Sequence, residues 1–271
     1  MIQDYTTVVG VDAKHLRQLA RSWPTWKEHK PSLLAHPMLV FHDREQVNAL
    51  DVREVVDHPN LWTYCWPPVG VDYGDGPDTA GMSERERYAA MWTSSQRHKM
   101  LAGYVHAPAL WVETPYWLKL DTCVFATGQD DWIDPAWFDD GSAIISHRWG
   151  YTKPPNQMME LDRWAKEQRD HSFLLAGTNS LNLVPKPGAK HLSHRRIISW
   201  CAFFNTLFTR ECARVATMSC GLCQLPVPSQ DGYLWYLAKR SGRGIMRTNM
   251  KKLGWDHRPV RDFSMDVLKE K

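Results

Sequence analysis

The sequence predicts an α/β fold in which a parallel sheet is covered by helices. The chain has 271 residues, which suits one large α/β domain with a sizeable core. Its hydrophobic share of 43% and charged share of 23% are ordinary for globular proteins and argue against intrinsic disorder. Segments with strand character also alternate with segments of helical periodicity, which is typical of parallel sheets.

The first element is expected at 5–12, where a β-branched run ends in Gly and Asp. A helix should follow, because Leu16, Leu19 and Trp23 recur at helical spacing and Asp12 can cap it. The next two strands are expected at 37–43 and 60–65. This strand, helix, strand order predicts parallel pairing.

The remaining elements continue the alternation. We expect helices at 84–106, 158–169, 206–216 and 231–240, and strands at 117–121, 142–146 and 196–204. The sequence shows no internal repeat, low-complexity tract or domain boundary, so a single domain is predicted.

Composition excludes some classes of protein. No apolar run approaches the ~18 residues of a membrane-spanning helix. The first residues lack the basic and apolar regions of a signal peptide, and six cysteines in a chain this long do not indicate a disulfide scaffold. A cytoplasmic protein is expected.

Charge is unevenly distributed although the net charge is only +3. Residues 113–140 contain seven acids and one lysine, whereas 239–271 contain ten basic residues and four acids. These segments are either two solvated faces or two sides of one charged ligand, such as a metal with a phosphate.

Three residues are candidates for chemistry, each with a structural alternative. Asp121 closes an apolar strand, where it is either a turn residue or a ligand for a cation or ribose. Asp231 begins a helix, either as its cap or as a general base. His257 precedes the basic tail, where it is either a packing residue or a metal ligand.

Cys220 and Cys223 form a Cys-x-x-Cys pair. Such a pair is half of a zinc site or a redox centre, but a second pair and a thioredoxin-like context are missing. Structural thiols are the favoured interpretation. The sequence also lacks the signatures of dehydrogenases, P-loop NTPases and zincins.

The order of these motifs resembles a nucleotide-sugar-dependent glycosyltransferase of the GT-A fold. The resemblance is carried by the Val8–Asp12 strand and turn, the strand closing on Phe41-His42-Asp43, the helix with Arg97 and Lys99, Trp117–Cys123 at the position of an Asp-x-Asp metal motif, Pro228–Trp235 at the position of an acidic acceptor-side motif, and His257. It implies a Rossmann-like single domain with a mixed, mainly parallel sheet flanked by helices. This domain would have a nucleotide-sugar-binding half (1–125), an acceptor half (126–258) and a basic tail (259–271).

The resemblance implies transfer of a hexose or pentose from a nucleoside diphosphate sugar to an acceptor hydroxyl. Asp231 would be the catalytic base, and Asp121 with His257 would hold Mn²⁺ or Mg²⁺. The donor would be bound by Gly10, Asp12, Asp43, Arg97, Lys99 and Asp121. The acceptor, whether a glycan, lipid, small molecule or modified DNA, stays open.

One residue departs from the family's motif, because Cys123 replaces its last acid. A thiolate is a poor ligand for Mn²⁺ or Mg²⁺. Either Asp121 and His257 hold the ion with water and phosphate, or the enzyme needs no metal.

Two alternatives use the basic C-terminal segment. The protein could bind nucleic acid without catalysis, through Lys239, Arg240, Arg243, Arg247, Lys251 and Lys252 with nearby tryptophans. It could also glycosylate hydroxylated bases in DNA. Of the fourteen tryptophans, Trp132, Trp137 and Trp149 are the ones we expect to stack on a sugar or acceptor.

Overall fold

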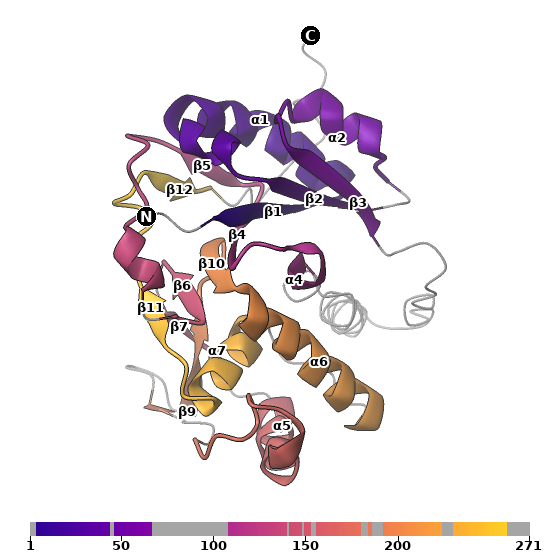
Figure 1. The fold of residues 1–271 in the computed structure, drawn as a ribbon, viewed down its shortest axis with the longest axis vertical. Helices are drawn as coiled ribbons and strands as arrows, with labels where there is room; N and C mark the ends of the chain where they lie inside the picture. Colours follow the sequence, from indigo (N-terminus) through magenta and orange to yellow (C-terminus); the bar gives the residue numbers. More distant parts are fainter. Residues whose placement is uncertain are drawn as a thin grey trace.

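A computed structural model describes residues 4–43, 46–66, 108–139, 141–147, 149–152, 156–179, 184–185, 192–223 and 230–258. In it the chain forms a seven-stranded sheet with helices on both faces (Figure 1). The helices are α1 (Ala13–His29), α2 (Ala49–Val55), α4 (Pro108–Trp111), α5 (Asn156–Glu167), α6 (Thr206–Cys223) and α7 (Gln230–Arg240), with short 3-10 turns at Pro31–Ala35, Pro135–Phe138 and Arg169–His171. None of the described helices is long and apolar enough to span a bilayer.

The main sheet confirms the predicted fold class. Its strands are β1 (Tyr5–Val11), β2 (Met38–Asp43), β3 (Leu61–Trp66), β4 (Tyr116–Leu120), β6 (Ile144–Ser146), β10 (Cys201–Asn205) and β11 (Ile245–Arg247), in the order β11-β6-β10-β4-β1-β2-β3. Only β10 among these seven runs antiparallel to its neighbours. The other six strands therefore end at the same edge.

Shorter strands form two small sheets. β5 (Val124–Ala126) pairs with β12 (Trp255–His257), and β9 (Leu192–Ile197) lies between β7 (Trp149–Thr152) and β8 (Val184–Pro185). The β5–β12 pair brings the end of the described chain back beside the residues that follow β4.

Both faces of the sheet are buried, as parallel strands require. Side chains alternate along β1, so that Val8 belongs to one hydrophobic cluster and Val9 to the other. The cluster with Val9 includes Leu19, Trp23 and Trp26 of α1, and the cluster with Val8 includes residues of α5, α6 and α7. The helices accordingly lie in two layers on either side of the strands (Figure 1).

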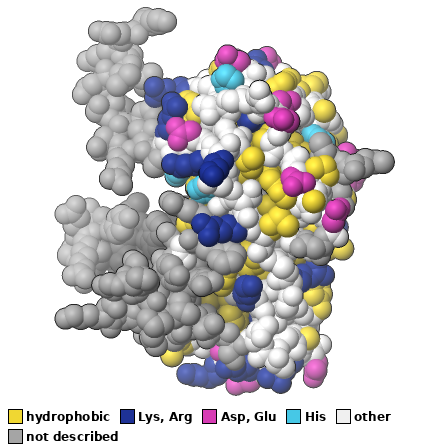
Figure 2. All heavy atoms as spheres, turned by 90° about the vertical axis from the view of Figure 1, so that its left-hand side faces the viewer, with side chains coloured by type: hydrophobic (Ala, Val, Ile, Leu, Met, Phe, Trp, Pro, Cys, Tyr) yellow, Lys and Arg dark blue, Asp and Glu magenta, His cyan; other side chains and the backbone are white. Residues whose placement is uncertain are grey.

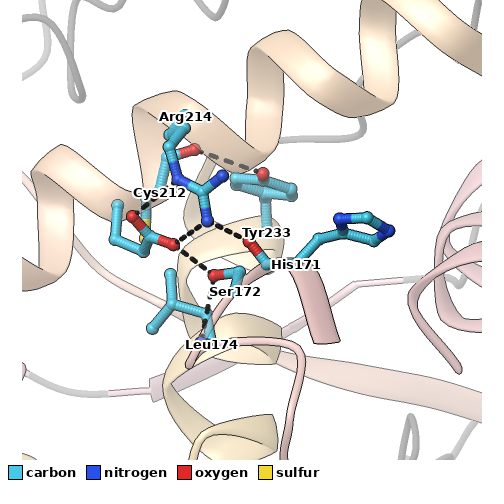
Figure 3. A network of polar contacts seen from close by, with 7 residues as sticks. His171, Ser172, Leu174, Cys212, Arg214 and Tyr233 are labelled. Carbon is cyan, nitrogen blue, oxygen red and sulfur yellow. Dashed lines mark hydrogen bonds and ion pairs between the residues drawn. The ribbon is translucent and has the colours of Figure 1, made fainter. Parts of the chain in front are cut away.

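A polar network fastens α6 to its surroundings (Figure 3). The Glu211 carboxylate accepts hydrogen bonds from the hydroxyl of Ser172 and from Nε of Arg214, the latter at 2.9 Å. The hydroxyl of Tyr233 on α7 donates to the carbonyl of Cys212 at 3.4 Å. These contacts join the segment after α5 to α6, and α6 to α7.

Two sequence predictions differ from the structure. The expected strand at 196–204 is two strands, β9 and β10, which belong to different sheets and are separated at 198–200. The sequence analysis also missed α2, although Asn48 and Asp51 form a capping box there. The expected helix at 84–106 lies outside the described residues.

Candidate functional site

Polar side chains collect where the six parallel strands end. Asp12 follows β1, Asp43 ends β2, Asp121 follows β4, His147 follows β6 and Arg247 ends β11. Ligands of open α/β sheets bind outside this carboxyl edge. The topology thus places the three predicted acids at the same edge of the sheet as His147 and Arg247.

The segment after β4 is a tight turn. The amide of Val124 donates to the carbonyl of Asp121 at 3.0 Å, which makes Thr122 and Cys123 the central residues of a β-turn. The amide of Asp121 donates to the carbonyl of Trp200 at 2.9 Å. Both ends of the turn are therefore held by backbone hydrogen bonds.

Helix α1 fixes this turn with polar groups from one face. The hydroxyl of Thr122 donates to Oε1 of Gln18 at 2.8 Å, and the hydroxyl of Ser22 donates to the carbonyl of Thr122 at 2.8 Å. The indole of Trp26 donates to the carbonyl of Val124 at 2.6 Å. Gln18, Ser22 and Trp26 are spaced four residues apart, so they line one side of the helix.

Strand β12 brings His257 to the turn. His257 pairs with Val124 in antiparallel register, and the next amide along the chain, that of Arg258, donates to the carbonyl of Cys123 at 2.9 Å. The ring of His257 stacks on Trp200, with ring centroids 5.4 Å apart and planes 5° apart.

Asp121, Cys123 and His257 consequently form one cluster. Each offers one ligand atom, these atoms all lie within 4.8 Å of one another, and all three residues are half-buried. The sequence predicted Asp121 and His257 as partners, and the structure brings them together. Cys123, which the sequence analysis treated as a departure from the motif, is the third member.

Burial tunes the protonation of this cluster. Burial and the neighbouring charge of Asp121 raise the pKa of the Cys123 thiol to about 11. The pKa of His257 is lowered, chiefly by burial, although Asp121 opposes the shift. A neutral imidazole keeps a nitrogen lone pair that a metal ion can use.

Lys119 is a further charged residue at the cluster and was not predicted. Its side chain is buried, forms an ion pair with Oδ1 of Asp121 and donates to the carbonyl of Ser199 at 3.2 Å. A carboxylate has two oxygens with about four acceptor positions, so this ion pair still leaves Asp121 able to bind an ion. A lysine within an otherwise apolar strand was the signal available in the sequence.

The three ligand atoms of the cluster could hold a divalent ion, and their chemical types favour some ions over others. One carboxylate oxygen, one sulfur and one imidazole nitrogen form a mixed ligand set. Mg²⁺ and Mn²⁺ prefer oxygen ligands, whereas sulfur favours softer ions.

A basic pocket lies at the same edge of the sheet. It has a volume of about 590 Å³ and is lined by His147, Arg247, Thr248, Asn249, Lys251 and Lys252. The ring of Trp200 contacts His147 at 4.9 Å between centroids and also stacks on His257. Trp200 thus connects the pocket to the cluster, and Figure 2 shows lysine and arginine side chains beside histidine on this side of the molecule.

The other predicted residues have different surroundings. Gly10 lies within β1, and Asp43 is half-buried at the end of β2. Asp12 caps α1, because its carboxylate accepts a hydrogen bond from the amide of His15 at 2.7 Å. Burial acts to raise the pKa of Asp12, but the hydrogen bonds from His15 outweigh burial and lower this pKa to about 2. Asp231 lies in the first turn of α7, but its side chain is outside the described part of the structure, as are Arg97 and Lys99.

Some expectations about aromatic and basic residues are wrong. Trp132 and Trp137 are buried beside Phe203 in the core, so they cannot stack on a sugar. Arg240 is 1% exposed and donates to backbone carbonyls, including that of Leu175, so it cannot contact nucleic acid. Among the described residues, most tryptophans therefore belong to the core, and the side chain of Trp149 lies outside the described part of the structure.

Neither a family model nor a curated protein sequence matches the chain. The fold is nevertheless similar to those of several solved structures. Core-mannan synthase A from Aspergillus fumigatus, in its Mn/GDP form, matches 94% of this chain and 75% of its own, with a TM-score of 0.62 and 14% identity. A mannosyltransferase from S. cerevisiae matches 95% of this chain and 71% of its own, with a TM-score of 0.58 and 14% identity.

The complex of the S. cerevisiae enzyme with GDP matches similarly, with a TM-score of 0.58 and 13% identity over 95% of this chain and 71% of that one. At such identities the likeness establishes the fold. The predicted GT-A architecture, a mainly parallel seven-stranded sheet flanked by helices in a single domain, is confirmed.

Proposed function

We propose that this protein is a glycosyltransferase that moves a sugar from a nucleoside diphosphate sugar to an acceptor hydroxyl. The observation that carries the proposal is the Asp121–Cys123–His257 cluster beside a basic pocket at the carboxyl edge of a GT-A sheet. Two of the similar structures contain GDP, so GDP-mannose is the first donor to test.

The basic pocket fits the most highly charged part of such a donor. Arg247, Lys251 and Lys252 line it, and none of its described lining residues is acidic. As the bond to the sugar breaks, negative charge grows on the leaving diphosphate, and fixed cations stabilise that charge more than they stabilise the intact donor. A divalent ion held by Asp121 and His257 would supply further neutralisation of the diphosphate.

The remaining donor contacts are assigned from the order of motifs. Gly10 lies near the end of β1, Asp12 follows β1 and Asp43 ends the adjacent β2, in the nucleotide-binding half (1–125), where they would hold the base and ribose. The carboxyl-edge rule for α/β sheets supports this part of the assignment. Arg97 and Lys99 would add positive charge near the diphosphate, an assignment that follows from the order of motifs alone.

Asp231 is proposed as the base that accepts the proton of the acceptor hydroxyl, from the acceptor half (126–258). The backbone of Asp231 lies in the first turn of α7, and the N-terminus of a helix favours negative charge. General-base assistance contributes about 10²–10⁴-fold to a rate.

A thermal-shift panel of GDP-mannose, UDP-glucose and the free nucleotides tests the donor. A ligand at a hundred times its Kd stabilises the native state by about 2.7 kcal/mol, which for a chain of this size raises Tm by roughly 5–10 °C. Transfer should then be measured with the donor that gives the largest shift.

Arg247→Ala should reduce the donor shift because it removes a cation from the pocket. Arg163→Ala, an exposed arginine on α5, is the matched control and should leave the shift unchanged. A panel in which no nucleotide sugar raises Tm contradicts the proposed function.

A further inference from the structure

We infer that the cluster Asp121–Cys123–His257 binds a thiophilic divalent ion of the zinc or cobalt type through all three side chains. The inference concerns the site of the proposed transfer and rests on that function for the ion's purpose. The test of the inference needs no turnover, so the inference and the proposed function can fail separately.

The first argument is geometric. With bonds of about 2.3 Å to sulfur and 2.0–2.1 Å to nitrogen, two ligand atoms of a tetrahedral zinc site lie about 3.5 Å apart. The ligand atoms of the three side chains already lie within 4.8 Å of one another. A contraction of about 1 Å, within reach of side-chain rotation, would bring them onto one ion.

The second argument is rigidity. Cys123 is a central residue of a β-turn. The backbone of this turn is hydrogen-bonded to Trp200, to Ser22 of α1 and to Arg258. His257 lies on β12 and stacks on Trp200. Ligands held in place before binding lose little freedom when the ion arrives, which favours affinity.

The third argument is the ligand set. Three protein ligands from Cys, His and a carboxylate leave a fourth tetrahedral position open, as in catalytic zinc sites. The ion-paired Lys119 beside Asp121 orients the carboxylate as an outer hydrogen-bonding partner.

Cobalt provides the direct readout. The protein is stripped of metal with chelator and titrated with Co²⁺, and a thiolate-to-cobalt charge-transfer band in the near ultraviolet reports sulfur ligation. Cys220 and Cys223 are replaced by serine throughout, because a Cys-x-x-Cys pair can bind such ions itself. The band is expected in this background and should be lost in Cys123→Ser.

Cys65→Ser is the matched control. Cys65 is also a half-buried free thiol, but it lies on β3, three strands from β4 and therefore about 14 Å away across the sheet. Its replacement should leave the cobalt band unchanged.

Metal selectivity gives the second readout. Most sites bind Zn²⁺ more tightly than Mn²⁺, so a preference for zinc alone proves nothing. The informative quantity is the change on Cys123→Asp, which replaces sulfur by oxygen. The ratio of the Mn²⁺ Kd to the Zn²⁺ Kd, from competition titrations, should fall at least ~10-fold, since even an altered outer partner costs 10–100-fold in metal affinity.

Three results would overturn the inference. They are the absence of a charge-transfer band in the background protein, a band that survives Cys123→Ser, and a selectivity ratio that Cys123→Asp leaves unchanged. Should Cys123→Asp fail to fold, the isosteric Cys123→Ser still decides. A positive nucleotide-sugar shift without a cobalt band would leave the proposed function standing and remove only this inference.

Discussion

Gly254→Ala should both destabilise the protein and disturb the ligand cluster. Gly254 has φ +80°, and a Cβ there would lie 1.8 Å from the carbonyl oxygen of Thr127. The amide of Thr127 also donates to the carbonyl of Gly254 at 2.7 Å. An alanine must therefore separate two backbone segments that are hydrogen-bonded to each other.

The magnitude follows from two costs. A non-glycine residue at this φ costs about 1–2 kcal/mol. Losing the backbone hydrogen bond costs about 1 kcal/mol more, and more again if the groups stay buried. The free energy of unfolding should fall by about 2–4 kcal/mol, and the start of β12 should shift, carrying His257 away from Asp121.

Urea unfolding measures the loss, and titration with Co²⁺ measures the displacement of His257. Gly242→Ala is the control, because Gly242 has φ +72° but no atom within 4 Å of its added Cβ. It should cost only the conformational 1–2 kcal/mol and leave ion binding intact. Equal losses for the two variants would refute the argument from the close approach at Thr127.

Three other predictions concern different parts of the molecule. Asp231→Asn should lower the transfer rate by at least ~100-fold while the donor's thermal shift is unchanged; normal turnover would exclude Asp231 as the base. Asp162→Ala should lower the free energy of unfolding by about 3 kcal/mol. Oδ1 of Asp162 accepts a hydrogen bond from the hydroxyl of buried Tyr236 at 2.9 Å and lies 3.9 Å from Nη1 of buried Arg240, so both groups would lose this partner. Urea unfolding measures the loss, and a loss below ~1 kcal/mol would contradict the prediction. Hydrogen bonding from Arg214 lowers the pKa of Glu211 in the folded state, so the folded protein binds fewer protons at Glu211 than the unfolded protein does. Glu211 therefore stabilises the fold above its ordinary pKa of about 4.5, and this stabilisation is lost as the pH falls through the pKa of the folded state. Thermal unfolding from pH 6 to pH 3 should thus show a shallower decline for Glu211→Gln, and parallel declines would oppose the linkage.

The fold was predictable because its signals are local. The β-branched run before Gly10, the cap at Asp12 and the strand ending at Asp121 all lie where the sequence pattern predicted. Periodicity could not reveal the break between β9 and β10. The residues on either side of the break, Ile197 at the end of β9 and the apolar start of β10, look like one continuous strand in the sequence. Only their pairing with other strands assigns them to separate sheets.

The candidate site was only half predictable. Asp121 and His257 could be paired through the resemblance, but nothing local in the sequence brings Trp200 between His257 and His147. The role of Ser22 was likewise hidden, since a small polar residue in a helix looks the same whether it faces solvent or holds a distant turn. Contacts across a hundred residues leave no periodic trace.

The two-stranded β5–β12 pair has a consequence for how the molecule is assembled. Two strands alone are marginal in water, and this pair relies on Trp255, which is buried against Trp26 and Trp132. An ion that joins Asp121 and Cys123 to His257 would tie the far end of the chain to the centre of the sheet. Docking of β12 and occupancy of the ion site would then be coupled, so that each stabilises the other. Until β12 has docked beside β5, His257 would not lie beside Asp121 and Cys123, so a protein without this pairing would lack one of the three ion ligands.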